Sequence, residues 1–150
     1  MNTTLFNHMI KRYNELSFTH HYLIGFTFKH NIYMVETTPE IFPYVLKLDK
    51  AGRGAGYSLR FVPNKKQKLF LMTLNPQLIC SDKYFNEKAS EVIYNRGEVF
   101  EKIITEMHNQ KWSKDNVPFT EDGDLTVNEI PYQIKFERAT FITEKSLANY

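Results

Sequence analysis

The chain has 150 residues, of which 42% are hydrophobic and 24% charged, with only 6 Gly and 6 Pro. This size and composition predict a single domain over 1–150 and exclude a disordered or repetitive chain. No stretch approaches the roughly 18 apolar residues that a membrane span requires, and residues 1–10 lack the pattern of a secretory signal. The single cysteine, Cys80, excludes a disulfide framework. We therefore expect a cytoplasmic protein with no membrane partner.

Charge is unevenly distributed, although the net charge is only +2. Residues 1–75 hold 10 Lys and Arg against 4 Asp and Glu, whereas residues 76–150 hold 9 against 13. A nucleic-acid surface beside a carboxylate metal site would have this asymmetry, although solvated surface charge of mixed sign gives the same composition. Aromatic residues make up 15% of the chain, and they favour strands and core packing.

The first part of the chain reads as a helix followed by strands, and we expect a strand-rich, basic portion over 1–80. Apolar spacing of one, three and four residues indicates the helix, and aromatic and branched runs indicate the strands. The predicted elements are a helix over 3–16, a hairpin of 22–28 with 32–36, a strand over 44–50, a glycine-rich loop over 51–56, and a hairpin of 57–62 with 68–74.

The second portion, over 81–150, begins with helical periodicity from Ser81 to about Gln110, which Gly97 divides in two. Short strands joined by turns follow, and a short helix ends the chain. The predicted elements after the helices are strands over 114–120, 124–127 and 130–138 and a helix over 143–148. Helix, strands, helix, strands and helix in this order predict an α+β domain.

The strongest chemical pattern lies in the predicted hairpin of 124–127 with 130–138. Period-2 alternation places Gln133 and Lys135 on one face of their strand, where we expect them to meet a cleft. The antiparallel pairing brings Asp124 to within about one or two cross-strand pairs of both. A carboxylate, an amide oxygen and an ammonium group are therefore predicted to converge.

These groups suit metal-assisted hydrolysis of a phosphodiester. An aspartate can hold Mg²⁺ or Mn²⁺, the cation polarises the phosphate and acidifies a bound water, and a lysine stabilises the developing negative charge. Glu101 or Glu98, on the preceding helix, would complete the metal shell. The predicted catalytic residues are Asp124, Gln133, Lys135 and Glu101, and the predicted metal ligands are Asp124, Glu101 and Glu98.

The constellation resembles the PD-(D/E)xK nuclease family over about residues 96–148. Gly97-x-x-x-Glu101 looks like the first-helix motif of resolvase-like members, Asp124 like the metal-binding aspartate, and Gln133-x-Lys135 like the Gln-x-Lys form of restriction-type members. The resemblance implies a restriction-endonuclease-like αβββα core, a DNA substrate and a symmetric homodimer. The last strand of the family core is missing from this stretch unless the N-terminal region supplies it.

We expect basic side chains of the second predicted hairpin to bind DNA. They are Arg60, Lys65, Lys66 and Lys68, and the three lysines are expected near the hairpin tip. Lysines can hold phosphates, but they also keep an exposed hairpin soluble and block pairing between sheet edges.

Two classes of function remain open from the sequence. The first is a metal-dependent nuclease or nuclease-like DNA-processing protein. The second is a non-catalytic accessory protein that binds DNA or a protein on the same or an unrelated α+β fold, which would explain Gln133 in place of a carboxylate. A metal requirement discriminates between them.

Overall fold

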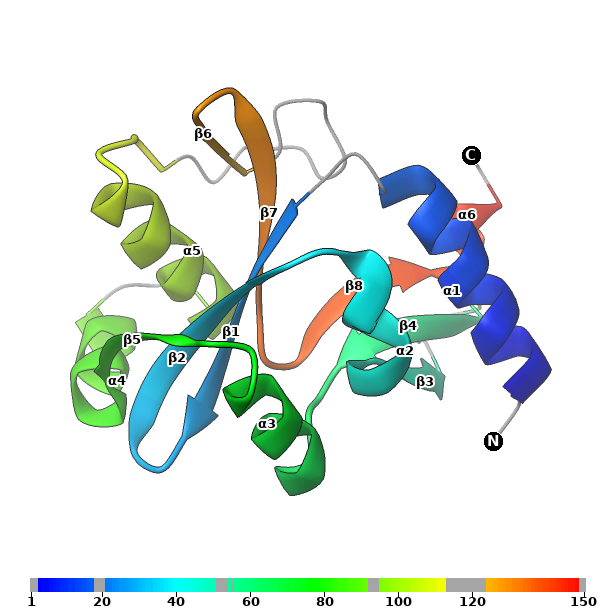
Figure 1. The fold of residues 1–150 in the computed structure, drawn as a ribbon, viewed down its shortest axis with the longest axis horizontal. Helices are drawn as coiled ribbons and strands as arrows, with labels where there is room; N and C mark the ends of the chain where they lie inside the picture. Colours follow the sequence, from blue (N-terminus) through cyan, green and yellow to red (C-terminus); the bar gives the residue numbers. More distant parts are fainter. Residues whose placement is uncertain are drawn as a thin grey trace.

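A computed structural model describes residues 3–17, 21–50, 54, 56–91, 95–112 and 124–148 (Figure 1). The fold is α+β, with a curled, mixed five-stranded sheet beside a three-stranded antiparallel sheet. The described helices are α1 (Thr3–Ser17), α2 (Phe42–Val45), α3 (Lys65–Met72), α4 (Asp82–Glu91), α5 (Arg96–Met107) and α6 (Glu144–Leu147), with a 3-10 turn at Pro39–Ile41. The described strands are β1 (His21–Phe28), β2 (Asn31–Thr37), β3 (Lys47–Lys50), β4 (Tyr57–Phe61), β5 (Gln77–Ser81), β6 (Leu125–Val127), β7 (Ile130–Phe136) and β8 (Ala139–Thr143).

Strand β1 lies in the middle of the larger sheet, whose order is β5-β2-β1-β7-β6. It pairs antiparallel with β2 and parallel with β7. The smaller sheet has the order β3-β4-β8, and β8 follows β7 after a turn at Glu137 and Arg138. Strands from both halves of the chain therefore share one sheet.

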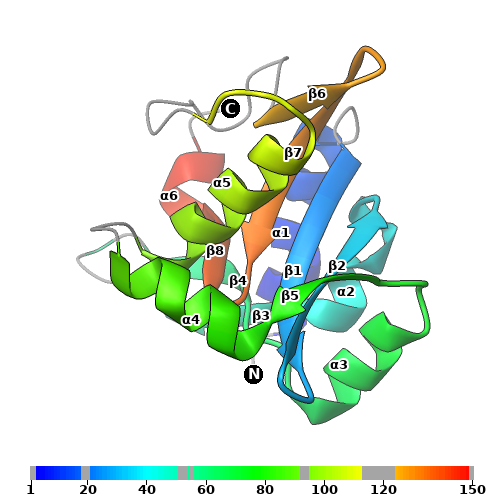
Figure 2. The same ribbon diagram turned by 90° about the vertical axis from the view of Figure 1, so that its left-hand side faces the viewer.

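Both faces of the five-stranded sheet are covered, as the nearly continuous apolar run of β1 indicates. Tyr22, Ile24 and Phe26 belong to a hydrophobic cluster with residues of α1 and the smaller sheet. Leu23 belongs to a second cluster, with residues of α4 and α5. Figure 2 shows α4 and α5 in front of the sheet and α1 behind it. Side chains on either face of β7 therefore lie between packed layers.

Several predicted elements are confirmed. The helix predicted over 3–16 is α1, whose apolar stripe is buried. The first hairpin is β1 with β2, joined by Lys29 and His30, whose φ angles of 45° and 70° are those of a type I′ turn. The long helical region contains the two predicted helices α4 and α5, but Gly97 does not divide them, because it lies in the first turn of α5. The C-terminal hairpin and final helix are β6, β7 and α6.

The second predicted hairpin is wrong, because residues 65–72 form α3 instead of a strand. A capping box starts this helix: Gln67 N donates to Asn64 Oδ1 at 2.8 Å, and Asn64 N donates to Gln67 Oε1 at 2.9 Å. Leu71 is fully buried in the cluster with α1. A local cap and a tertiary contact therefore outweigh the strand-like run of apolar residues.

Other differences concern short segments. The strand predicted over 44–50 divides into α2 and β3, and β5 and β8 were not predicted. The predicted strand over 114–120, and most of the predicted loop over 51–56, lie outside the described residues. In the part of the chain that the structure describes, no helix is long and apolar enough to cross a membrane.

Gly25, in the middle of β1, touches the ring of Phe100 on α5, and this contact provides a test of how α5 packs. A Cβ atom at Gly25 would lie 2.3 Å from the Phe100 Cζ atom. We therefore predict that Gly25→Ala lowers the free energy of unfolding by about 1–3 kcal/mol, as overpacking does. In urea unfolding, adding Phe100→Leu should recover part of this loss. Additive effects of the two changes would contradict the close packing.

Candidate functional site

The β6–β7 hairpin sets the position of Asp124. The turn residues Asn128 and Glu129 have φ angles of 50° and 69°, and the register pairs Leu125 with Tyr132. Asp124 N donates to the Tyr132 carbonyl at 2.8 Å, and Asp124 Oδ2 accepts a hydrogen bond from Ile134 N at 2.9 Å. The Asp124 carboxylate is therefore held beside the middle of β7, close to Gln133 as predicted.

Alternation along β7 separates its side chains as predicted, but the polar face is much more enclosed than expected. Ile134 belongs to the cluster beneath α5, whereas Gln133 and Lys135 pair in register with Tyr22 and Ile24 of β1, on the opposite face. Gln133 is only 1% exposed. The cleft predicted from the sequence is therefore an interior site, because α1 and the smaller sheet cover this face.

The side chain of Gln133 has an unsatisfied donor. Its Nε2 atom is buried and has no hydrogen-bond partner among the residues that the structure describes. Leaving a buried amide donor unpaired costs about 1–3 kcal/mol, so such groups are rare in proteins and mark places where a ligand or water completes the bonding. The Gln133 amide thus has a donor available for a further hydrogen bond.

Lys135 lies half-buried beside this amide. Its Nζ atom is 5.5 Å from the centre of the Phe141 ring, and among the described side chains no carboxylate lies within salt-bridge distance of it. Burial lowers the pKa of Lys135, while the carboxylates of Asp124 and Glu101 act in the opposite direction. Both carboxylates therefore lie near enough to Lys135 to influence its charge.

The two glutamates predicted as metal ligands have different surroundings. Glu98 belongs to the N-terminal cap of α5: its backbone N donates to Asn95 Oδ1 at 2.8 Å, and Asn95 Nδ2 donates to Glu98 Oε1 at 2.9 Å. Glu101 lies one turn further along α5, near Lys135. The structure thus places Asp124, Gln133 and Lys135 on one face of β7, whereas Glu101 acts on Lys135 from α5, which covers the opposite face, and Glu98 lies at the end of that helix.

The set of oxygen donors suits a hard cation but is small. Among the described residues, no three His, Cys, Asp or Glu side chains are grouped as a metal site. A cation here would depend on the carboxylates of Asp124 and Glu101 and on the amide oxygen of Gln133. Mg²⁺ is commonly held by one or two carboxylates and keeps several of its waters, so these donors fit it.

Of the four residues predicted to contact DNA, Arg60 and Lys68 form ion pairs within the fold. Arg60 donates to Asp49 at 3.2 Å and to the Arg138 carbonyl at 2.8 Å, and Lys68 pairs with Glu137 at 2.9 Å. Arg60 thus connects β4 to β3 and to the β7–β8 turn, and Lys68 connects α3 to the same turn.

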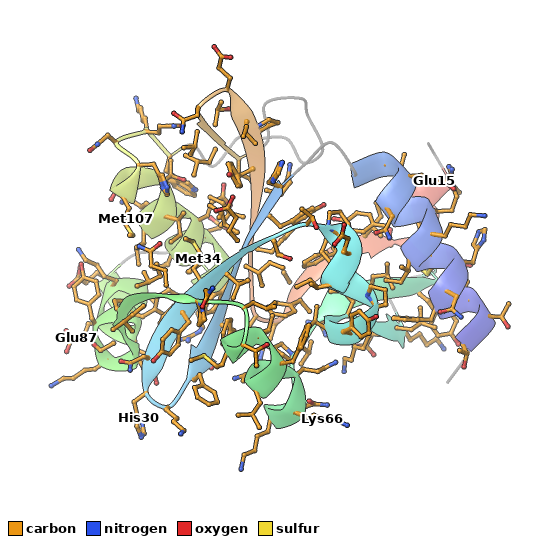
Figure 3. The ribbon with its side chains drawn as sticks, in the orientation of Figure 1. Glu15, His30, Met34, Lys66, Glu87 and Met107 are labelled. Carbon is orange, nitrogen blue, oxygen red and sulfur yellow. The ribbon has the colours of Figure 1, made fainter. Side chains whose placement is uncertain are left out.

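Lys65 and Lys66 are exposed on the first turn of α3. Lys65 lines a hollow of about 330 Å³ together with Lys29 and His30 of the β1–β2 turn. Figure 3 shows His30 and Lys66 at the same end of the molecule. Lys29 and His30 were not predicted to belong with these lysines, because only the fold brings their turn next to α3.

Two tyrosines near the site were also missed. Tyr13 of α1 and Tyr22 of β1 are fully buried, and their hydroxyl oxygens lie 3.0 Å apart. The pKa of Tyr13 is well above its usual value, first because of burial, then through Tyr22, with Asp124 contributing. Helical periodicity marks Tyr13 only as a core residue, so no signal in the sequence connects it with Asp124.

Comparison with known proteins gives no match: no family model, no curated protein and no solved structure is similar to this chain. The function must therefore be inferred from the residues and geometry of the site.

Replacing Lys135 tests whether this side chain on the polar face of β7 stabilises the fold. Because its pKa is lowered in the folded state, the charged form destabilises the fold, and stability should rise with pH between the folded and unfolded pKa values. We predict that Lys135→Met keeps or raises the melting temperature at neutral pH, as apolar replacement of a buried charge often does. Lys11→Met, at an exposed site on α1, is the control. Clear destabilisation by Lys135→Met alone would indicate a structural role for the ammonium group.

Proposed function

We propose that the protein is a metal-dependent, nuclease-like enzyme that hydrolyses phosphodiester bonds in DNA. The observation that carries this proposal is the placement of Asp124, Gln133 and Lys135 together on one face of β7, with Gln133 buried. The carboxylate of Glu101, on α5 over the opposite face, also acts on the charge of Lys135. Polar groups collected inside a fold cost free energy, which favours a functional use for them.

Each of these residues has a task in the proposed reaction. Asp124 and Glu101 would hold Mg²⁺ or Mn²⁺, and Gln133 would add its amide oxygen. When bound, the cation supplies Lewis acidity at the phosphate and lowers the pKa of a bound water. Lys135 stabilises the negative charge that develops on the phosphate oxygens. The Ile134 N–H group orients the Asp124 carboxylate, as backbone donors do for metal-binding carboxylates.

The order of the helices and strands that carry the site residues supports the resemblance to the PD-(D/E)xK family. Helix α5 carries Glu101, Asp124 precedes β6, β7 carries Gln133 and Lys135, and α6 follows β8. The N-terminal strand β1, parallel to β7, offers the strand that residues 96–148 lack. One departure is that β8 pairs with β4 of the smaller sheet. The homodimer implied by the resemblance stays a prediction.

Cleavage of supercoiled, linear and branched DNA in Mg²⁺ or Mn²⁺ tests the proposal. We expect cleavage that is abolished by chelation and reduced about 10²–10³-fold or more in Asp124→Asn and Lys135→Met, the range for loss of one electrostatic stabiliser. On α5, Glu101→Gln should lower the rate, whereas Glu106→Gln, an exposed position on the same helix, should not. Undiminished cleavage by Asp124→Asn would refute the site. The absence of any cleavage would favour the non-catalytic accessory protein.

The exposed cations of the β1–β2 turn and α3 are the proposed contact with the DNA backbone. We call Lys29, His30, Lys65 and Lys66 the basic tip. In the type I′ turn, Lys29 and His30 occupy positions that favour Asn and Gly, so they carry a local conformational cost. Among the described residues, neither Lys65 nor Lys66 forms an ion pair. These lysines are therefore available to phosphates.

Salt dependence of DNA binding tests this contact. In EDTA, where cleavage is blocked, the Lys29, Lys65 and Lys66 to Ala triple variant should bind more weakly. Its slope of log affinity against log salt should be smaller by about 2–3, because each phosphate contact contributes roughly 0.9. Fluorescence anisotropy measures both. A control triple variant with the same change of charge replaces the exposed Lys11, Lys88 and Lys145. Equal slopes for the two variants would exclude the basic tip.

A further inference from the structure

A second hollow adjoins the hollow of the basic tip, at the carboxyl ends of β1 and β7. Its volume is about 870 Å³, and its walls come from β1, the β7–β8 turn, α4 and the beginning of α5. Thr27 and Asp82 line both hollows. Figure 1 shows the β7–β8 turn at the same end of the sheet as the β1–β2 turn and α3. We call the second hollow the arginine hollow, because Arg96 and Arg138 line it.

Arg96 is held in place by two aromatic rings. The Cζ atom of its guanidinium group lies 4.7 Å from the centre of the Phe85 ring and 5.8 Å from the centre of the Phe136 ring, and both rings are buried. Its Nη1 atom donates to Asn86 Oδ1. A guanidinium group has five N–H donors, and no carboxylate of the described residues forms an ion pair with this one. Arg96 therefore has donors for a further acceptor and a defined position.

Arg138 extends from a turn that does not need a side chain. Its φ angle of 71° is in the left-handed region, which costs free energy for every residue with a Cβ atom and suits glycine. The backbone is fixed by its neighbours: Arg138 N donates to the Phe61 carbonyl at 2.6 Å, and Arg60 donates to the Arg138 carbonyl at 2.8 Å. The Arg138 side chain is exposed and forms no ion pair with a described residue. The turn therefore does not explain an arginine at this position.

The arginine hollow also contains two carboxylates, and one of them is already compensated. Glu137 Oε1 accepts hydrogen bonds from Thr27 N and Thr27 Oγ1 and pairs with Lys68 Nζ at 2.9 Å. The other, Asp82, lies in the first turn of α4, where the helix dipole favours a negative charge. Two guanidinium groups are thus set against one carboxylate without an ion pair, so the hollow attracts anions.

We propose that the arginine hollow binds a phosphate group of DNA, with Arg96 and Arg138 as the donors. A guanidinium group can donate two parallel hydrogen bonds to two phosphate oxygens, which a lysine ammonium group cannot do. The inference rests on the proposed function, because it takes DNA as the ligand. Since the two hollows adjoin, the strand that contacts Lys29 and Lys65 would continue across the carboxyl ends of β1 and β7. The phosphate belongs to the interior of the strand or to its 5′ end.

The test measures binding of a short labelled duplex in EDTA by fluorescence anisotropy, with and without a 5′-phosphate. In Arg138→Gly, we expect the Kd to rise about 10-fold or more, as for loss of a hydrogen bond to a charged group. The slope of log affinity against log salt should fall by about 0.9. Glycine suits the left-handed backbone, so the melting temperature should stay close to that of the wild type. Arg96→Lys keeps the charge, so it should raise the Kd with little change of slope.

Lys11→Met is the matched control, because it removes one positive charge from an exposed position on α1. A loss confined to the phosphorylated duplex supports a terminal phosphate, and an equal loss with both duplexes supports a phosphate within the strand. If Arg138→Gly and Arg96→Lys both bind both duplexes as Lys11→Met does, the phosphate pocket is refuted while the proposed function stands. If the wild type binds neither duplex, the proposed function fails, and this inference fails with it.

Discussion

The parallel pairing of β1 with β7 is the contact on which the rest of the structure depends. It joins residues 21–25 to residues 132–136, which are far apart in the chain. Because β1 already pairs with β2, and β7 with β6, this contact makes one five-stranded sheet out of two hairpins. It also brings α1 over the face of β7 that carries Gln133 and Lys135. Local interactions could form either hairpin, but only this long-range pairing encloses the site between them.

Burial of the β7 face that carries Gln133 and Lys135 changes the chemical properties of both side chains. Burial lowers the pKa of Lys135, and the Nε2 atom of Gln133 has no hydrogen-bond partner in the described part of the chain. Both effects oppose folding, since buried charges and unpaired donors cost free energy. The same low-dielectric surroundings strengthen interactions with a cation or a phosphate. Polar groups that oppose folding in this way are the pattern expected where function conflicts with stability.

The elements that could be predicted are those with strong local signals. Apolar periodicity identified α1, and paired strand-like runs identified the β1–β2 and β6–β7 hairpins. The prediction of a strand over residues 65–72 was wrong. The apolar run is compatible with a strand, but a capping box and the burial of Leu71 stabilise a helix there. Within the site, alternation and the turn at Asn128 and Glu129 were enough to bring Asp124 next to Gln133.

The sequence by itself determined which donor groups meet, because the spacing of residues along a helix or hairpin fixes their neighbours within that element. Asp124, Gln133 and Lys135 belong to one hairpin, so their proximity needs no knowledge of the fold. Only the tertiary structure decided that Gln133 is buried, that Lys135 is half-buried and that the charge of Glu101 acts on Lys135. It also placed Tyr22 beside Gln133 in the sheet and brought the hydroxyl of Tyr13 to 3.0 Å from that of Tyr22. These relations depend on packing between elements distant in the chain, and periodicity within one element carries no information about which elements pack together.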